Sequence, residues 1–138
     1  MEKYPNAKIN IYGHSLGSMD AQYAMAALEA AQIERIQQAY IFNGPDIYRI
    51  LSPEQRKIVD QIKGRIYNYA DAKDNISMVG RDIAKGSIGS VGMVYYVDSE
   101  PEDPINQHMT YGYRLDKDGK IKILSNTSTV AYNDFLIK

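Results

Sequence analysis

The 138-residue sequence contains no cysteine and no tryptophan, and its positive and negative charges nearly balance. Without cysteine, this chain has no disulfide, no thiolate metal ligand and no cysteine nucleophile. Its 16 basic and 17 acidic residues give a net charge of -1, which provides no electrostatic footprint for nucleic acid or an anionic membrane. We therefore expect neither nucleic acid nor a membrane surface as a partner.

Long hydrophobic runs are also missing. No apolar stretch approaches the roughly 18 residues of a membrane span, so the sequence predicts no membrane span. The first residues, MEKYPNA, lack the apolar core of a signal peptide. This segment leaves the localisation open, with the cytoplasm as the default. The length suits one domain over residues 1–138, which can bury about two thirds of the surface that the unfolded chain exposes.

The most informative stretch contains a Gly-x-Ser-x-Gly motif at Gly13–Gly17. Alternating residues at 8–12 predict a strand before it, and apolar residues at three- and four-residue steps predict a helix over Ser15–Ala31. A strand, this motif and a helix together indicate a nucleophile elbow, with Ser15 at the apex of a tight turn that both glycines make possible. The backbone N–H of Leu16, at the helix start, is the expected oxyanion-hole donor.

Further along the chain, strands and helices alternate. The pattern predicts strands at 39–43, 65–69 and 93–97, and a helix from Ser52 to about Lys63. Because parallel neighbours need crossover connections, this order indicates an α/β fold with a parallel sheet. Near the end, residues 111–115 and 120–124 flank the turn sequence Asp-Lys-Asp-Gly and predict a C-terminal β-hairpin.

A nucleophilic serine needs a base, and the chain contains two histidines. Since adjacent side chains diverge as they leave a tight turn, we interpret His14 as packing against the elbow. His108 is then the predicted base for Ser15. A carboxylate must orient its imidazole, and we expect this acid before His108 in the sequence, at the carboxyl end of a strand. Four aspartates meet this condition: Asp46, Asp71, Asp74 and Asp98.

Asp71 and Asp74 follow the second strand after the elbow strand. In a fold built around a nucleophile elbow, the acid is expected at this position. We favour Asp74, because Ile76 two positions later could anchor its loop while the carboxylate faces the cleft. Asp71 is the second choice. The alternative that both carboxylates only cap turns or face solvent stays open.

These residues resemble the α/β-hydrolase superfamily, in particular its class 3 (fungal-type) lipase branch and related lipase-like bacterial domains. The resemblance covers residues 5 to about 113. The stretches that carry it are the elbow, Tyr40–Pro45, Asp74–Ile76 and His108–Tyr111.

The resemblance implies a three-layer α/β-hydrolase fold whose sheet begins, in this chain, at the elbow strand. It implies a carboxylic ester hydrolase acting on an ester or lipid, with Ser15 as nucleophile, His108 as base, and Asp74 or else Asp71 as the acid. It implies no metal and no organic cofactor. Two other functions stay open: a non-catalytic α/β binding or assembly module that keeps the elbow, and a thioesterase or acyltransferase.

Few residues precede Ser15, whereas an α/β-hydrolase has several strands and one oxyanion donor before its elbow. We therefore expect the chain to be the carboxyl-terminal part of a longer protein. The elbow strand would then lack a neighbour on one side. Because an open strand edge invites pairing with another chain, we expect a homodimer through that edge.

Overall fold

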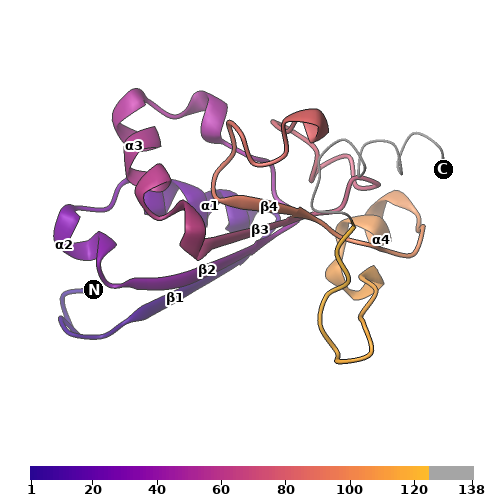
Figure 1. The fold of residues 1–138 in the computed structure, drawn as a ribbon, viewed down its shortest axis with the longest axis horizontal. Coiled ribbons are helices and arrows are strands. Elements are labelled where there is room, and N and C mark those ends of the chain that lie inside the picture. The colour runs from indigo at the N-terminus through magenta and orange to yellow at the C-terminus, as the bar shows by residue number, and fades with distance from the viewer. Residues whose placement is uncertain (125–138) are drawn as a thin grey trace.

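The computed structural model describes residues 1–124 of the protein. They form a sheet with helices packed along it (Figure 1). The strands are β1 (Ile9–His14), β2 (Ile36–Phe42), β3 (Ile66–Ala70) and β4 (Met93–Tyr96). The α-helices are α1 (Leu16–Ala26), α2 (Ala30–Ile33), α3 (Pro53–Gln61) and α4 (Pro104–His108). Single 3-10 turns lie at η1 (Tyr48–Ile50), η2 (Lys63–Arg65), η3 (Ile83–Lys85) and η4 (Thr110–Gly112).

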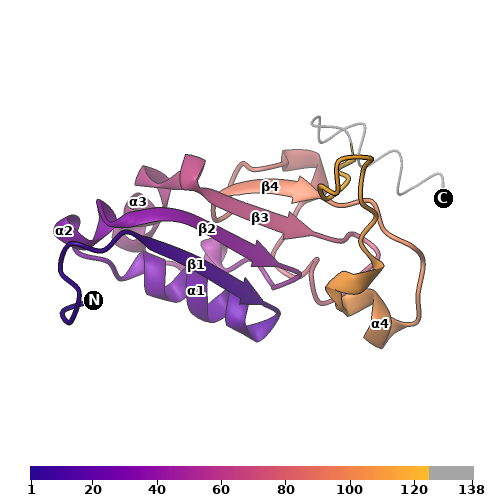
Figure 2. The ribbon, with the colours of Figure 1, turned by 90° about the horizontal axis from the view of Figure 1, so that it is seen from below.

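The four strands of the sheet are parallel and follow one another in the order β1-β2-β3-β4. The predicted parallel α/β sheet is therefore confirmed. Because parallel crossovers are right-handed, a sequential strand order places the connecting helices on one face. Helix α1 packs against both β1 and α3, and both helices lie on the same side of the sheet (Figures 1 and 2).

The opposite face of the strands is not covered by a helix within residues 1–124. Helix α4 lies beyond the carboxyl ends of the strands instead of across them (Figure 1). The described part of the chain therefore has two layers, and the expected three-layer arrangement is not found there. A third layer would need a crossover on the other face, which a strictly sequential strand order does not provide.

Strand β2 illustrates how the two faces differ. Ala39 and Ile41 are fully buried beneath the helices, while Tyr40 and Phe42 alternate with them and point to the open face. The core between the sheet and the helices is aliphatic, and burying one such side chain contributes about 1.5–3 kcal/mol. Its largest fully buried hydrophobic members are Met25, Ile41, Ile47, Ile62, Ile66, Val59 and Val91.

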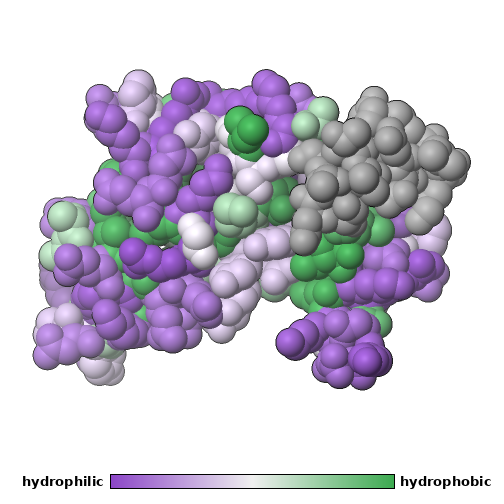
Figure 3. Space-filling model, in the orientation of Figure 1, coloured by the Kyte–Doolittle hydropathy of each residue, from purple (hydrophilic) through white to green (hydrophobic). Residues whose placement is uncertain are grey.

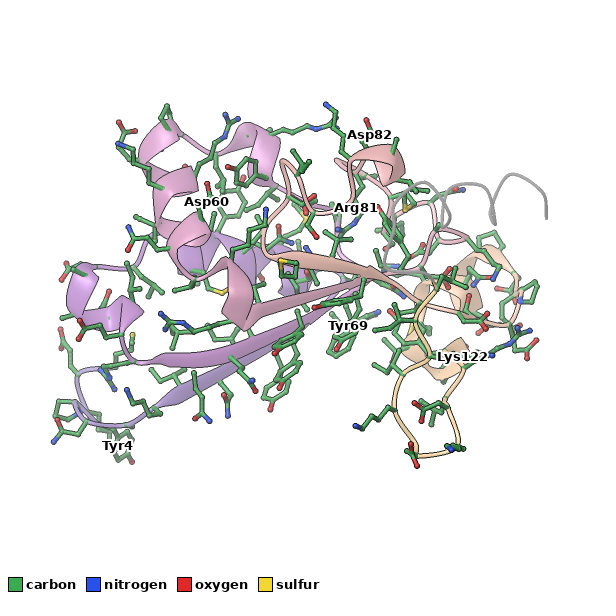
Figure 4. The ribbon with its side chains drawn as sticks, in the orientation of Figure 1. Tyr4, Asp60, Tyr69, Arg81, Asp82 and Lys122 are labelled. Atoms are coloured by element: carbon green, nitrogen blue, oxygen red, sulfur yellow. The ribbon has the colours of Figure 1, made fainter. Side chains whose placement is uncertain are left out.

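Aromatic rings stack across the open face. Tyr12 stacks on Tyr40, Tyr40 on Tyr67 and Tyr67 on Tyr95, with ring centroids 5.4, 5.2 and 6.1 Å apart. Figure 4 shows Tyr69 projecting from the same face. Cross-strand aromatic pairs stabilise a sheet, and tyrosine combines an apolar ring with a hydroxyl that water can solvate. Five of the twelve tyrosines thus lie on the open, half-wet face of the sheet.

Local capping signals account for the helix boundaries. The predicted helix over 15–31 divides into α1 and α2, because Glu29 begins a new helix with Gln32 in a reciprocal capping box. The predicted start of α3 is confirmed, since Ser52 and Gln55 exchange hydrogen bonds of 3.2 and 2.9 Å. None of the helices in residues 1–124 has the length and hydropathy needed to cross a membrane.

The predicted C-terminal hairpin is present as a tight antiparallel turn. The N–H of Asp116 donates to the carbonyl of Lys120 at 2.8 Å, and Gly119 has a φ of 77°. Its arms pair through the isolated bridge between Leu115 and Ile121 and do not form extended strands. The turn lies at the carboxyl end of the sheet (Figure 1).

Candidate active site

The loop between β1 and α1 consists of Ser15 alone. Strand β1 ends at His14 and α1 begins at Leu16. Ser15 has φ 57° and ψ -121°, a conformation that non-glycine residues rarely adopt. Its N–H donates to the carbonyl of Phe42 at 3.0 Å, which ties the turn to the end of β2. The strained strand-turn-helix geometry predicted for this stretch is therefore present.

Close packing around the elbow depends on two glycines, one of which the motif did not include. A Cβ on Gly13 would lie 2.5 Å from the carbonyl oxygen of Gly17, whereas a Cβ on Gly17 would meet nothing within 4 Å. The prediction that both motif glycines are needed for space is therefore wrong for Gly17. A Cβ on Gly44 would lie 2.4 Å from that of Ser18 and 2.7 Å from the carbonyl oxygen of Ser15. In the sequence, Gly44 appeared only within the Tyr40–Pro45 stretch that carries the resemblance.

Three predicted site residues meet at the carboxyl ends of the strands. His108 ends α4, and its Nε2 lies 2.6 Å from Oγ of Ser15. Its Nδ1 lies 2.6 Å from Oδ2 of Asp74. The side chain of Asp74 is 2% exposed and that of His108 is 14% exposed. An unbroken chain of short hydrogen bonds thus joins side chains that are far apart in the sequence.

The loop that carries Asp74 is organised by its own carboxylate. Oδ1 of Asp74 accepts the N–H of Ile76 at 3.1 Å, and Oδ2 accepts the N–H of Ser77 at 3.3 Å. Asp74 therefore caps this turn and also contacts the imidazole. Ile76 is 45% exposed, so the prediction that it anchors the loop is wrong. The anchor is the fully buried Ser77, whose Oγ accepts the N–H of Asp71 at 3.2 Å.

The second-choice acid occupies a different position. Oδ2 of Asp71 accepts a hydrogen bond of 2.7 Å from Nε2 of Gln107, the residue before His108. Asp71 is buried, so this bond fixes the end of α4 and not the imidazole. The carboxylate of Asp98 pairs instead with Arg114 at 3.2 Å.

The fourth aspartate belongs to a buried ion pair on the helix side of the sheet. Asp46 and Arg81 are 3.4 Å apart, with side chains 0% and 1% exposed. Burial raises the pKa of Asp46 and lowers the pKa of Arg81, and the opposite charge of the partner counteracts each shift. Arg81 also donates to Gly44 O at 2.9 Å, Asn68 Oδ1 at 2.8 Å and Ser77 O at 2.7 Å. It therefore joins the acid loop to the segment that follows β2.

His14 contacts the other histidine. Its Nε2 lies 2.9 Å from the carbonyl oxygen of His108, and the two rings are 5.1 Å apart. The side chain therefore packs beside the elbow and also bonds to the backbone of the predicted base. Leu16 stands at the first position of α1, where a helix leaves its N–H groups without intrahelical partners.

A mostly apolar hollow of about 320 Å³ lies between the end of β2, the segment that follows α4 and the C-terminal turn. Figure 3 shows hydrophobic atoms at the base of the C-terminal turn, where this hollow lies. Its lining consists of Phe42, Thr110, Tyr111, Tyr113, Leu115 and Ile121.

Within residues 1–124, no group of three or more histidine, aspartate or glutamate side chains is placed to hold a metal ion.

Comparison with known proteins identifies one family. The family model described as Mbeg1-like matches residues 1–134, which is nearly the whole chain. Neither a curated protein nor a solved structure gives a significant match.

This match corrects two predictions. The resemblance to the α/β-hydrolase superfamily and its class 3 lipase branch is wrong as a family assignment, because the matching model describes a different family. The carboxylic ester hydrolase function that the resemblance implied is wrong with it. The motifs behind that resemblance are short and encode local turn geometry, which unrelated families can share. The chain belongs to the Mbeg1-like family.

Proposed function

We propose that Ser15 is an activated nucleophile, that His108 is its general base and that Asp74 orients His108. The observation that carries this proposal is the Ser15–His108–Asp74 hydrogen-bond chain, with 2.6 Å at each link. The strained backbone of Ser15 also supports it, because such strain is concentrated at functional sites.

The chemistry of the proposed step follows from the two nitrogens of one imidazole. With the proton of neutral His108 on Nδ1, that N–H donates to Asp74, and Nε2 is free to accept the hydroxyl proton of Ser15. Oγ then forms a bond to an electrophilic carbonyl carbon, the carbonyl π electrons move onto oxygen, and the proton moves to Nε2. The N–H of Leu16 supplies one donor for the oxyanion.

The apolar hollow at the end of β2 indicates which part of a substrate would lie there. The side chains that line it carry no formal charge and are mainly aromatic or aliphatic. Thr110 and Tyr111 belong to this lining and follow His108 closely in the chain. A pocket of this kind suits an uncharged apolar group of the substrate.

The proposal is tested by covalent labelling. A fluorophosphonate probe reacts by forming a bond from Oγ of Ser15 to phosphorus while fluoride leaves and His108 takes the proton. We expect intact-protein mass spectrometry to show one adduct per chain, and peptide mapping to place it on Ser15. The Ser15→Ala variant should remain unmodified. If the folded wild-type chain gains no adduct at millimolar probe concentration, Ser15 is not an activated nucleophile.

The outer edge of β1 is proposed as a dimer contact. Among residues 1–124, β1 has a neighbouring strand on one side only. The N–H groups of Ile9 and Ser15 point toward β2 and its preceding residue Arg35. Because successive N–H groups of a strand point to opposite sides, the N–H of Asn10 points outward. An unpaired edge of this kind can pair with the same edge of a second copy.

We expect light scattering coupled to size exclusion to give twice the mass of one chain at high protein concentration. Asn10→Pro removes the outward N–H and should shift the protein to the monomer. The matched variant Asn10→Thr keeps that N–H and should remain dimeric. A wild-type chain that elutes as a monomer at high concentration would contradict the contact.

A further inference from the structure

We propose that Asn43 is a positioning residue that couples the loop of the base to the loop of the acid. The inference rests on the proposed roles of Ser15, His108 and Asp74. Asn43 follows β2 directly and is fully buried. Its side chain contacts three segments that converge on the site. Asn43 itself takes no part in the reaction.

On the side of the base, Asn43 holds the backbone of His108. Its Nδ2 donates to the carbonyl oxygen of His108 at 3.2 Å. The same carbonyl also accepts Nε2 of His14 at 2.9 Å. The two donors come from the ends of neighbouring strands, since His14 pairs with Phe42 in the register of β1 and β2. Two bonds to one carbonyl fix the backbone from which the imidazole projects.

On the side of the acid, Asn43 holds the start of the loop that presents Asp74. Its Oδ1 accepts the N–H of Asp71 at 3.2 Å. That N–H also lies 3.2 Å from Oγ of Ser77, the residue whose own N–H binds Asp74. The amide of Asn43 therefore reaches both loops, with the donor directed at one and the acceptor at the other.

A third contact holds the amide of Asn43 in this orientation. The hydroxyl of Tyr113 donates to Oδ1 of Asn43 at 2.6 Å. Burial raises the pKa of this tyrosine, and the charges of Asp71 and Asp74 raise it further, so the hydroxyl keeps its proton and remains a donor. With Oδ1 accepting from this hydroxyl, Nδ2 is directed to the carbonyl of His108.

The backbone of Asn43 explains why an asparagine stands here. Its φ is 49°, a left-handed conformation in which asparagine and glycine are the favoured residues. Glycine would adopt this conformation without providing the amide, whereas leucine or valine would be strained. Asparagine is the residue that combines the conformation with both a donor and an acceptor.

The test compares two substitutions that leave this backbone conformation accessible. Asn43→Gly removes the amide, and Asn43→Asp keeps Oδ1 but replaces the donor by an oxygen facing the carbonyl of His108. We expect each variant to slow fluorophosphonate labelling of Ser15 by about 10- to 100-fold, since misplacing a catalytic group by 1 Å can cost about 10²-fold. Asn6→Gly, at an exposed asparagine before β1, is the matched control and should label at the wild-type rate.

A merely structural role predicts a different pattern. In that case the Asn43→Asp variant, once thermal unfolding has shown that it is folded, would be labelled as fast as the wild type. This result would overturn the proposal.

A second test removes the other donor to the same carbonyl. His14→Phe keeps a ring beside His108 but removes the hydrogen bond from Nε2 of His14. The double variant with Asn43→Gly should lose more than either single change, because both donors bind one carbonyl.

A spectroscopic measurement separates this inference from the proposed function. The proton on Nδ1 of His108, hydrogen-bonded to Asp74, should give a downfield ¹H NMR signal in the wild type. We expect Asn43→Gly and Asn43→Asp to weaken or shift it. If the wild type is not labelled but the signal responds to these substitutions, the nucleophile proposal fails and the positioning role stands. An unchanged signal in both folded variants would overturn the positioning role.

Discussion

Replacing His108 by alanine is expected to slow fluorophosphonate labelling of Ser15 by about 10²- to 10⁴-fold, the usual contribution of a positioned general base. The expectation follows from Nε2, which lies 2.6 Å from Oγ of Ser15 and is the group placed to take its proton. The measurement is the second-order rate constant for adduct formation, followed by intact-protein mass spectrometry.

Free imidazole provides the control for this substitution. Because His108 is partly exposed, imidazole can enter the space left by His108→Ala and should restore part of the labelling rate. Thermal unfolding by circular dichroism shows whether the variant is folded. A folded His108→Ala protein that labels within a few-fold of the wild type would rule out His108 as the base.

The same measurement distinguishes the two candidate acids. Asp74→Asn should slow labelling by about 10²-fold or more, because the carboxylate on Nδ1 of His108 is lost. Asp71→Asn should have a smaller effect, since Asp71 bonds to Gln107 and not to the imidazole. The reverse order of the two effects would make Asp71 the acid.

Replacing Asp46 by asparagine is expected to lower the free energy of unfolding by about 3–5 kcal/mol, the typical cost of removing one partner of a buried ion pair. The reason is that Arg81 is 1% exposed and would keep its charge without a counter-charge. The amide oxygen introduced by Asp46→Asn can still accept the N–H groups of Tyr48 and Val91. The loss therefore reports the missing charge together with the contacts of Oδ2, which accepts from Asn68 and Arg81. Urea unfolding followed by circular dichroism measures the change.

An exposed ion pair gives the comparison for Asp46→Asn. Glu100 pairs with Arg114 at 3.0 Å in contact with solvent, where water screens the charges. Glu100→Gln should therefore leave the urea midpoint nearly unchanged. A loss below about 1 kcal/mol for Asp46→Asn, in the range of exposed pairs, would show that Arg81 finds another way to compensate its charge.

Several features of the fold and site could be predicted from the sequence because they depend on neighbouring residues. The elbow follows from Gly13, Ser15 and the alternating strand before them. The start of α3 follows from Ser52 and Gln55, which cap each other within one turn. His108 was accessible by elimination, since a sequence with two histidines leaves few alternatives.

Other features depend on segments that meet only after folding. Four aspartates follow strands in equivalent ways, and the packing of α4 decides that Asp74 faces the imidazole while Asp71 faces Gln107. The strained asparagine after β2 and the buried Arg81 gave no signal in the sequence. Each acts through contacts with residues tens of positions away.

The sequence by itself determined the parallel α/β architecture, the strand-turn-helix around Ser15 and the candidate base, because periodicity, glycine and capping act over a few residues. It did not determine the family, since short motifs describe a turn and not a whole chain. Only the tertiary structure decided that helices cover one face of the sheet, that Asp74 lies beside the imidazole of His108 and that Asn43 joins the two loops. Those outcomes depend on strand order and on long-range packing, which local sequence patterns do not encode.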